Sequence, residues 1–192
     1  MKRIAKLFIA LSAFTALVAS ASAAVETYAI DPVHSSIAFS IRHFFSKVPG
    51  SFSKFDGTIV VDRDNLEKSS AEVTIDIGSL NTANEKRDTH VKSPDFLDAA
   101  KFPTITFKST SWKKTGPDSY DVSGNLTIKG TTKPVVLKVK SLGFGPGMKG
   151  VMLSGWEAAT ALKRSDFGVT GFEQVLGDDV DVTISVEADL KK

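Results

Sequence analysis

The chain of 192 residues contains no cysteine. Disulfides, thiolate metal ligands, cysteine nucleophiles and lipidated cysteines are therefore excluded. Tyrosine and tryptophan are scarce, with two of each, whereas phenylalanine occurs 13 times. After residue 23, no apolar run approaches the ~20 residues that a membrane-spanning helix needs. We therefore expect no transmembrane segment in the mature chain.

The first 23 residues are a predicted signal peptide. Three Lys and Arg residues occupy the first six positions, residues 7–18 are apolar, and residues 21–23 form a small-residue cleavage site. We expect the mature chain to begin at Ala24 and to be periplasmic. Loss of the three basic residues turns the formal charge of +2 into −1. This balance leaves no basic excess for binding nucleic acid.

Alternation of apolar and polar residues recurs along the mature chain and predicts strands with one buried face. The predicted strands cover residues 36–44, 57–62, 71–77, 104–108, 120–128, 135–142, 151–162 and 180–188. Most are joined by short polar or glycine-containing turns. We therefore predict one all-β domain, residues 24–192, in which an antiparallel sheet closes or nearly closes into a barrel.

One interval, residues 79–103, breaks the alternation. Residues 81–92 are polar helix formers, and Ser93-Pro94-Asp95 has the pattern of a helix start with Ser93 as N-cap. We predict a short helical flap over one end of the barrel, held down by Phe96, Leu97 and Phe102.

The inward side of the barrel allows two interpretations. Its aromatic and aliphatic side chains form either a packed core or the wall of a long apolar cavity, since a barrel of about eight strands can hold a ligand. Ala71, Gly124 and Ala188 are small residues on the inward side. They are expected to leave volume in the lumen.

Catalysis has no strong candidate. His34 and His43 have opposite parity along the chain, and neither they nor His90 show the spacing of a compact metal site. Nucleophile-elbow and phosphate-loop motifs are absent from the sequence. A metal-assisted hydrolase that uses His34, His43 or His90 nevertheless stays open as an alternative, as does a barrel filled by its own side chains.

Six motifs, in order along the chain, resemble the YceI-like family of lipid- and polyisoprenoid-binding proteins. They are DPVHSS at 31–36, FDGTI at 55–59, RDTHVKSPDFL at 87–97, KFP at 101–103, GNLTIKG at 124–130 and RSDFG at 164–168. The resemblance implies a lipocalin-like extended antiparallel β-barrel with an elongated pocket for a long isoprenoid or acyl tail. It implies a periplasmic binding protein for a polyisoprenoid, prenyl phosphate or quinone, not an enzyme.

The alternation and the resemblance together predict the binding residues. The tail pocket is expected to be lined by inward strand residues, namely Ile37, Phe39, Ile41, Val73, Ile75, Ile77, Ile105, Phe107, Val122, Gly124, Leu126, Ile128, Val182 and Ile184. A polar head would stay near the mouth, where desolvation costs less. The head-group candidates are Arg42, His43, Arg87 and His90. The expected partner is a long-chain amphiphilic lipid, with no metal or other cofactor, and we allow for a homodimer.

Overall fold

The computed structural model describes residues 25–191 and is dominated by β-strands. The predicted signal peptide, residues 1–23, and the predicted mature start at Ala24 lie outside the described residues. The strands are β1 (Glu26–Ile30), β2 (Ser36–His43), β3 (Ser46–Phe52), β4 (Phe55–Val61), β5 (Ser70–Asp76), β6 (Leu80–Asn81), β7 (Thr104–Lys114), β8 (Ser119–Ile128), β9 (Thr131–Pro146), β10 (Met152–Lys163) and β11 (Leu176–Leu190). The helical elements are α1 (Glu85–Lys92) and the 3₁₀ turns η1 (Leu66–Lys68), η2 (Ile77–Ser79), η3 (Met148–Gly150) and η4 (Arg164–Phe167).

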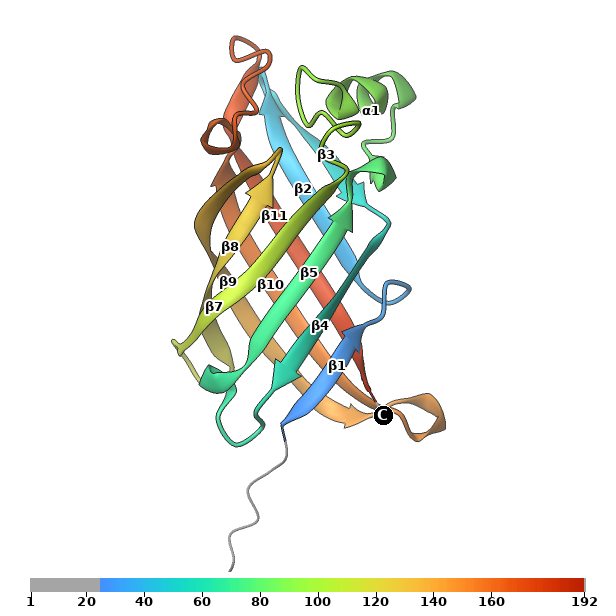
Figure 1. The fold of residues 1–192 in the computed structure, drawn as a ribbon, viewed down its shortest axis with the longest axis vertical. Coiled ribbons are helices and arrows are strands. Elements are labelled where there is room, and N and C mark those ends of the chain that lie inside the picture. The colour runs from blue at the N-terminus through green and yellow to red at the C-terminus, as the bar shows by residue number, and fades with distance from the viewer. Residues whose placement is uncertain (1–24, 192) are drawn as a thin grey trace, which may run out of the picture.

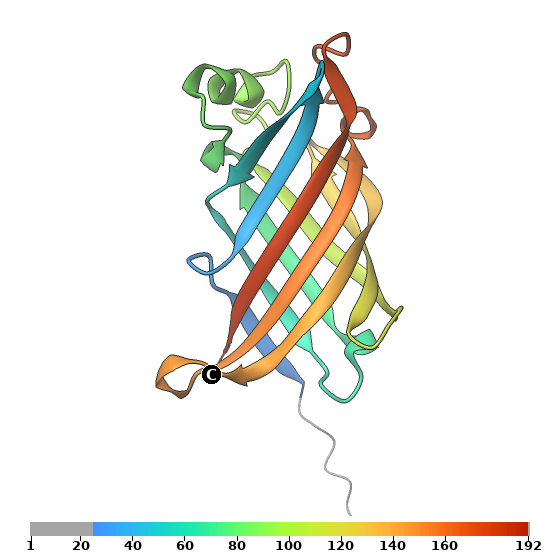
Figure 2. The same ribbon diagram turned by 180° about the vertical axis from the view of Figure 1, so that it is seen from behind.

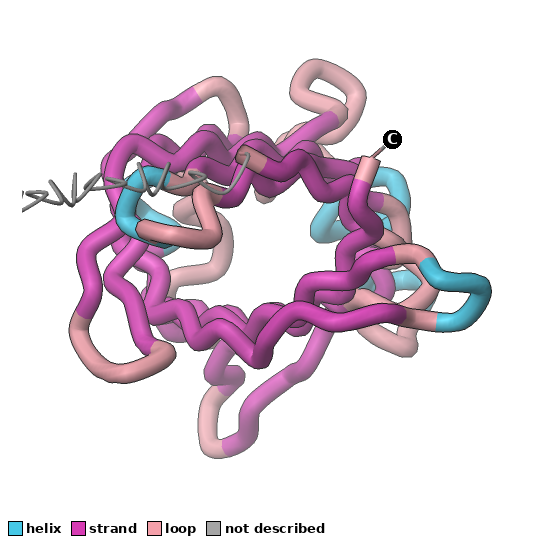
Figure 3. Tube along the Cα trace, turned by 90° about the horizontal axis from the view of Figure 1, so that it is seen from below, coloured by secondary structure: helices cyan, strands magenta, loops and turns pink. Residues whose placement is uncertain are grey.

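Eight strands close into an antiparallel barrel in the order β1-β4-β5-β7-β8-β9-β10-β11, with β11 paired to β1 (Figures 1 and 2). The long strand β11 pairs with β2 along one part and with β1 along another, and β3 and β6 extend the sheet beyond β2. Seen along its axis, the ring of strands surrounds an oval interior (Figure 3). Closure removes the exposed edges of the ring, and the predicted all-β barrel is confirmed.

The alternation in the sequence correctly separates the two faces of the strands. In β7, for example, Ile105, Phe107 and Ser109 are buried while the residues between them are exposed. All eight predicted strands are present, with ends that differ from the predictions by several residues. The strands β1, β3 and β6 were not predicted. Within residues 25–191, no helix has the length and apolar character needed to span a bilayer.

The predicted flap is present, but its helix begins at Glu85, nine residues before the start expected at Pro94. The helix α1 begins after Asn84, whose side-chain oxygen accepts the Arg87 N–H at 3.0 Å, and it ends at Lys92, before Ser93. The prediction that Ser93 starts a helix is therefore wrong. Proline disfavours helical backbone at the residue before it, and Ser93 is extended, with ψ of 170° before Pro94.

An aromatic cluster fills the barrel at the end opposite α1. Trp112 lies near the end of β7, where its ring centroid is 6.1 Å from that of Tyr120 and 5.5 Å from that of Trp156. Phe144 lies 5.6 Å from Trp156 and 5.9 Å from Tyr28. Burial raises the pKa of Tyr28 to about 12, so that its phenol stays a neutral donor. These five side chains, the aromatic plug, close this end of the barrel to a ligand.

Gly124 faces inward but does not widen the lumen. A Cβ at this position would lie 2.4 Å from the Phe107 ring and 2.7 Å from the Lys108 carbonyl oxygen. The volume that the sequence suggested for a ligand is thus occupied by Phe107. The expectation that Gly124 lines the pocket is wrong, because a neighbouring strand supplies a large side chain that covers it.

Candidate functional site

An apolar cavity of about 460 Å³ occupies the barrel between the aromatic plug and the helical end. This volume is within the ~300–1,000 Å³ of small-molecule sites. Eleven of the fourteen predicted tail-pocket residues line it: Ile37, Phe39, Ile41, Val73, Ile75, Ile105, Phe107, Leu126, Ile128, Val182 and Ile184. They come from β2, β5, β7, β8 and β11, so most of the cavity wall is hydrocarbon.

The other three predicted tail residues are buried elsewhere. Val122 is 1% exposed and packs in the part of the core that contains the aromatic plug, where no space is left. Ile77 lies in η2, after β5 has ended, and is fully buried. Gly124 is covered by Phe107, as described above. None of the three belongs to the cavity wall.

The mouth of the cavity lies between the flap and the loop that follows η4. Val91, Phe96 and Leu97 line it from the flap, and Phe172 lines it from the loop. The Phe96 and Phe172 rings stack with centroids 5.8 Å apart, and the His90 ring meets each edge-on at 5.1 Å. The flap and the loop are thus joined by aromatic contacts across the mouth.

Arg87 lines the cavity and is held in place by Thr82. Its Nε–H donates to Thr82 Oγ1 at 2.8 Å and its Nη2 donates to the Thr82 carbonyl at 2.6 Å. The Thr82 hydroxyl donates to Asp88 at 2.5 Å, a bond that lowers the pKa of the Asp88 carboxyl. Because only some of the guanidinium N–H groups are used by Thr82, the others are available to an oxygen at the mouth.

Of the head-group candidates on β2, His43 lines the cavity and Arg42 does not. Side chains alternate between the faces of a strand, and Ile41 and His43 take the inner face. Arg42 therefore faces outward, where it is exposed. The prediction that Arg42 lies at the mouth with His43 is wrong for this reason.

Arg164 is a cavity-lining residue that was not predicted as part of the site. Although its side chain is charged, it is 7% exposed. Its guanidinium donates to two backbone carbonyls of the loop after η4, those of Val169 (2.8 Å) and Gly171 (2.7 Å). It also donates to the carbonyls of the first two residues of β11, Gly177 (2.9 Å) and Leu176 (3.5 Å). Arg164 thus fixes the loop that carries Phe172 to the mouth. The RSDFG motif at 164–168 was the available signal.

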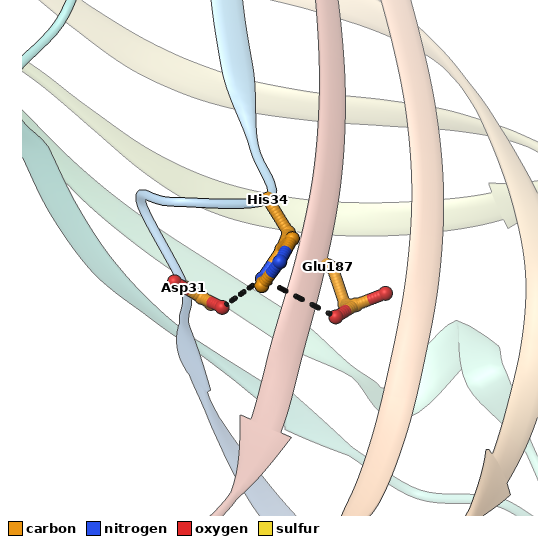
Figure 4. Close-up of side chains that lie close together, drawn as sticks. All are labelled: Asp31, His34 and Glu187. Atoms are coloured by element: carbon orange, nitrogen blue, oxygen red, sulfur yellow. Dashed lines mark hydrogen bonds and ion pairs between the residues drawn. The ribbon is translucent and has the colours of Figure 1, made fainter. Parts of the chain in front are cut away.

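The structure does not bring the three histidines together. His43 and His90 lie at the mouth, whereas His34 is outside the barrel, in the turn between β1 and β2 (Figure 4). In residues 25–191 one group of side chains could supply three metal ligands: Asp31, His34 and Glu187, with ligand atoms within 4.8 Å of one another. Asp31 also accepts the Val33 N–H at 2.8 Å. These bonds order the turn.

The pKa of His34 is expected to be above its ordinary 6.5 and to fall in an Asp31→Asn variant. The raised pKa comes first from the hydrogen bond to Asp31, 2.6 Å away, and from its charge, and less from Glu187 at 3.8 Å. The stabilisation of the turn is therefore present at acidic pH and is lost as pH rises through the folded-state pKa. NMR titration measures the pKa of His34 in the wild type and in each variant. Glu187→Gln should lower this pKa less than Asp31→Asn does. A larger effect of Glu187→Gln would contradict the assignment of Asp31 as the main cause.

Comparison with known proteins identifies relatives along nearly the whole chain. The YceI-like domain matches residues 28–188. A UPF0312 protein of Azotobacter vinelandii is 38% identical over 185 residues, which cover 95% of this chain and 96% of the relative. Protein YceI of Salmonella newport is 40% identical over 174 residues, with 89% and 91% of the two chains covered.

Solved structures share the barrel. BcnA of Burkholderia cenocepacia has a TM-score of 0.76 at 26% identity, covering 83% of this chain and 99% of its own. The YceI protein of Campylobacter jejuni has a TM-score of 0.72 at 34% identity, covering 77% and 88%. A polyisoprenoid binding domain from Saccharophagus degradans shares the fold, with a TM-score of 0.66 at 16% identity over 85% and 98%. The domain match and these relatives show that the chain belongs to the YceI-like family.

Proposed function

We propose that this protein binds one amphiphile with a long isoprenoid or acyl tail and carries it in the periplasm. The observation that carries the proposal is the apolar cavity of about 460 Å³, which the aromatic plug closes at one end. Protein interiors are ordinarily close-packed. A barrel that keeps such a volume unfilled by its own side chains is suited to a hydrocarbon ligand.

The apolar lining supports the binding of a hydrocarbon tail. Burial of hydrocarbon is worth roughly 25 cal/mol per Å² of area removed from water, so a tail can bind without specific polar contacts. The barrel that this chain shares with the polyisoprenoid binding domain of Saccharophagus degradans agrees with an isoprenoid ligand. The predicted signal peptide supports the periplasmic location. The proposal includes no metal and no cofactor besides the bound lipid.

The head group is proposed to lie at the helical end. Polar side chains of the cavity wall gather there, with Arg87 and His90 on α1 and His43 at the end of β2. An oxygen-rich head can accept bonds from these groups while remaining close to water, which reduces its desolvation cost. This arrangement orients the ligand with its tail toward the aromatic plug.

Extraction of the natively purified protein tests the proposal. Organic extraction and mass spectrometry should recover about one equivalent of a long-tailed lipid, and the delipidated protein should take up one equivalent of a prenyl lipid. Metal analysis of the same sample is the control. Bound zinc without lipid would contradict the carrier and favour a metal-assisted hydrolase; an empty protein that takes up no lipid would contradict both.

For a prenyl diphosphate, Arg87→Ala is expected to weaken binding about tenfold. A hydrogen bond to a charged group contributes ~1.5 kcal/mol at the lower end of its range, which corresponds to about tenfold in affinity. We use the lower end because Arg87 is exposed to solvent. Arg42→Ala is the matched control, since this arginine faces outward. Binding is measured at low and high salt for the diphosphate and for a neutral prenyl lipid of equal tail length. Equal losses for both lipids, or for both variants, would contradict a head-group role for Arg87.

A further inference from the structure

The turn between β2 and β3 carries two exposed phenylalanines. Phe45 is 99% exposed, and Phe44, whose ring meets His43 edge-on with centroids 4.9 Å apart, is still 56% exposed. Two-residue hairpin turns favour Asn and Gly, because they require backbone conformations that bulky residues adopt poorly. Phe44 nevertheless has a left-handed backbone, with φ of 46°. Neither folding of the turn nor burial explains an aromatic pair here.

The aromatic pair lies beside the mouth of the cavity. His43, which precedes it, lines the cavity, and the Phe44 N–H donates to the Val175 carbonyl of the loop after η4 at 3.0 Å. That loop carries Phe172, which is 54% exposed and also has a positive φ, 58°. Within residues 25–191, the strongly exposed aromatic side chains are these three phenylalanines. The β2–β3 turn and the loop before β11, which carry them, lie at the same end of the barrel as α1 (Figure 1). Scattered apolar residues on a surface need no explanation, but three aromatics around one opening do.

We propose that Phe44 and Phe45 insert into the interface of an anionic phospholipid bilayer and dock the mouth of the barrel on the membrane. Exposed aromatic rings next to basic residues are a pattern of proteins that bind bilayer surfaces. The turn is flanked by Arg42 and Lys47 and contains no acidic residue from 42 to 47. Arg42, which the cavity does not use, would then face anionic head groups; Lys47 pairs with Asp181 on β11.

This inference rests on the proposed function for its biological role. A lipid that passes directly from the membrane into the cavity does not expose its tail to water. Its physical basis is independent of the ligand, since it depends only on the exposed aromatic pair and on Arg42. A bilayer is favoured over a protein partner because the surface is a narrow hairpin tip and not a broad patch. Specific protein interfaces bury ~800 Å² on each partner.

Vesicle flotation tests the docking surface. Full-length mature protein is mixed with vesicles of phosphatidylcholine and phosphatidylglycerol, and the partition coefficient is compared with that of Phe44→Asn/Phe45→Gly. Asn adopts the left-handed backbone of position 44 readily and Gly adopts any backbone conformation at position 45, so the fold should be retained, which thermal melting checks. We expect a roughly hundredfold lower partition coefficient, because each of the two phenylalanines contributes about tenfold when buried. Leu142→Ser, which removes a residue 53% exposed on β9, is the control and should leave binding unchanged.

Failure of this inference is distinguishable from failure of the proposed function. Lipid occupancy, measured by extraction, should be equal in the wild type and the double variant, while the rate of lipid uptake from vesicles should fall at least tenfold in the variant. Wild-type protein that holds lipid but does not float, or a double variant that floats as well, would overturn the docking surface and point to a protein partner. Flotation that depends on the phenylalanines in a protein that holds no lipid would support docking and overturn the carrier.

Discussion

Replacement of Arg164 with methionine is expected to lower the free energy of unfolding by about 3–5 kcal/mol, because three backbone carbonyls at a buried site lose their hydrogen-bond donors. Methionine keeps much of the side-chain length but donates no hydrogen bond. The carbonyls of Val169, Gly171 and Gly177 would then lose donors at 2.7–2.9 Å. A buried acceptor left unsatisfied costs ~1–3 kcal/mol, and water entering the mouth recovers part of this. Urea unfolding measures the change.

The same substitution should loosen the mouth of the cavity. Arg164 orders the loop that carries Phe172, and the contacts of Phe172 with Phe96 and His90 join this loop to the flap. Amide hydrogen exchange in residues 168–176 should therefore become faster in Arg164→Met than in Arg42→Met, which removes an outward arginine and should affect stability little. Equal stability of the two variants would show that the buried guanidinium does not hold the loop.

Alternation in the sequence predicts which side chains face inward, but not at what height along the barrel they lie. This explains why eleven predicted tail residues line the cavity while Val122 does not. Val122 shares the inner face of β8 with Leu126, yet it lies directly opposite Trp112 on the neighbouring strand β7. The aromatic plug is assembled from β1, β7, β8, β9 and β10. Its position depends on strand register, which a single sequence does not specify.

Some local signals in the sequence are compatible with two structures. Ser93-Pro94 can begin a helix or end one, and here the tertiary position of the flap selects the second. The strand β3 contains Pro49 and Gly50, residues that are depleted in strands, so its pattern was missed. Arg42 could have been placed correctly, because strict alternation with His43 assigns it to the outside.

Arg164 illustrates a different limit. A charged residue contributes nothing to an apolar pattern, and burial of its guanidinium depends on carbonyls that the chain brings together only after η4 has formed. Gly168 helps to place them, since its left-handed backbone, with φ of 70°, ends η4 and accompanies hydrogen bonds back to Arg164 and Ser165. The family motif at 164–168 identified the segment without indicating its role.

Val182→Phe is expected to abolish most tail binding while leaving the barrel folded. Val182 lies on β11 between Phe39 and Thr160 on the neighbouring strands and faces the cavity. A larger ring there would project into open volume and displace two or three methylene groups of the tail. At ~0.8 kcal/mol for each methylene, affinity should fall roughly 15- to 50-fold. Lipid titration and thermal melting of delipidated protein measure the two effects.

Two matched variants make this result specific to the cavity. Thr183→Phe adds a ring one residue away on the outer face, where Thr183 is exposed, and should leave affinity unchanged. Gly124→Leu adds bulk on the inner face, but against the Phe107 ring and the Lys108 carbonyl oxygen, so overpacking should destabilise the barrel by ~1–3 kcal/mol. Stability lost in Val182→Phe to the same extent as in Gly124→Leu would mean that the space beside Val182 is part of a packed core. Full lipid occupancy in a folded Val182→Phe variant would place the tail somewhere other than this cavity.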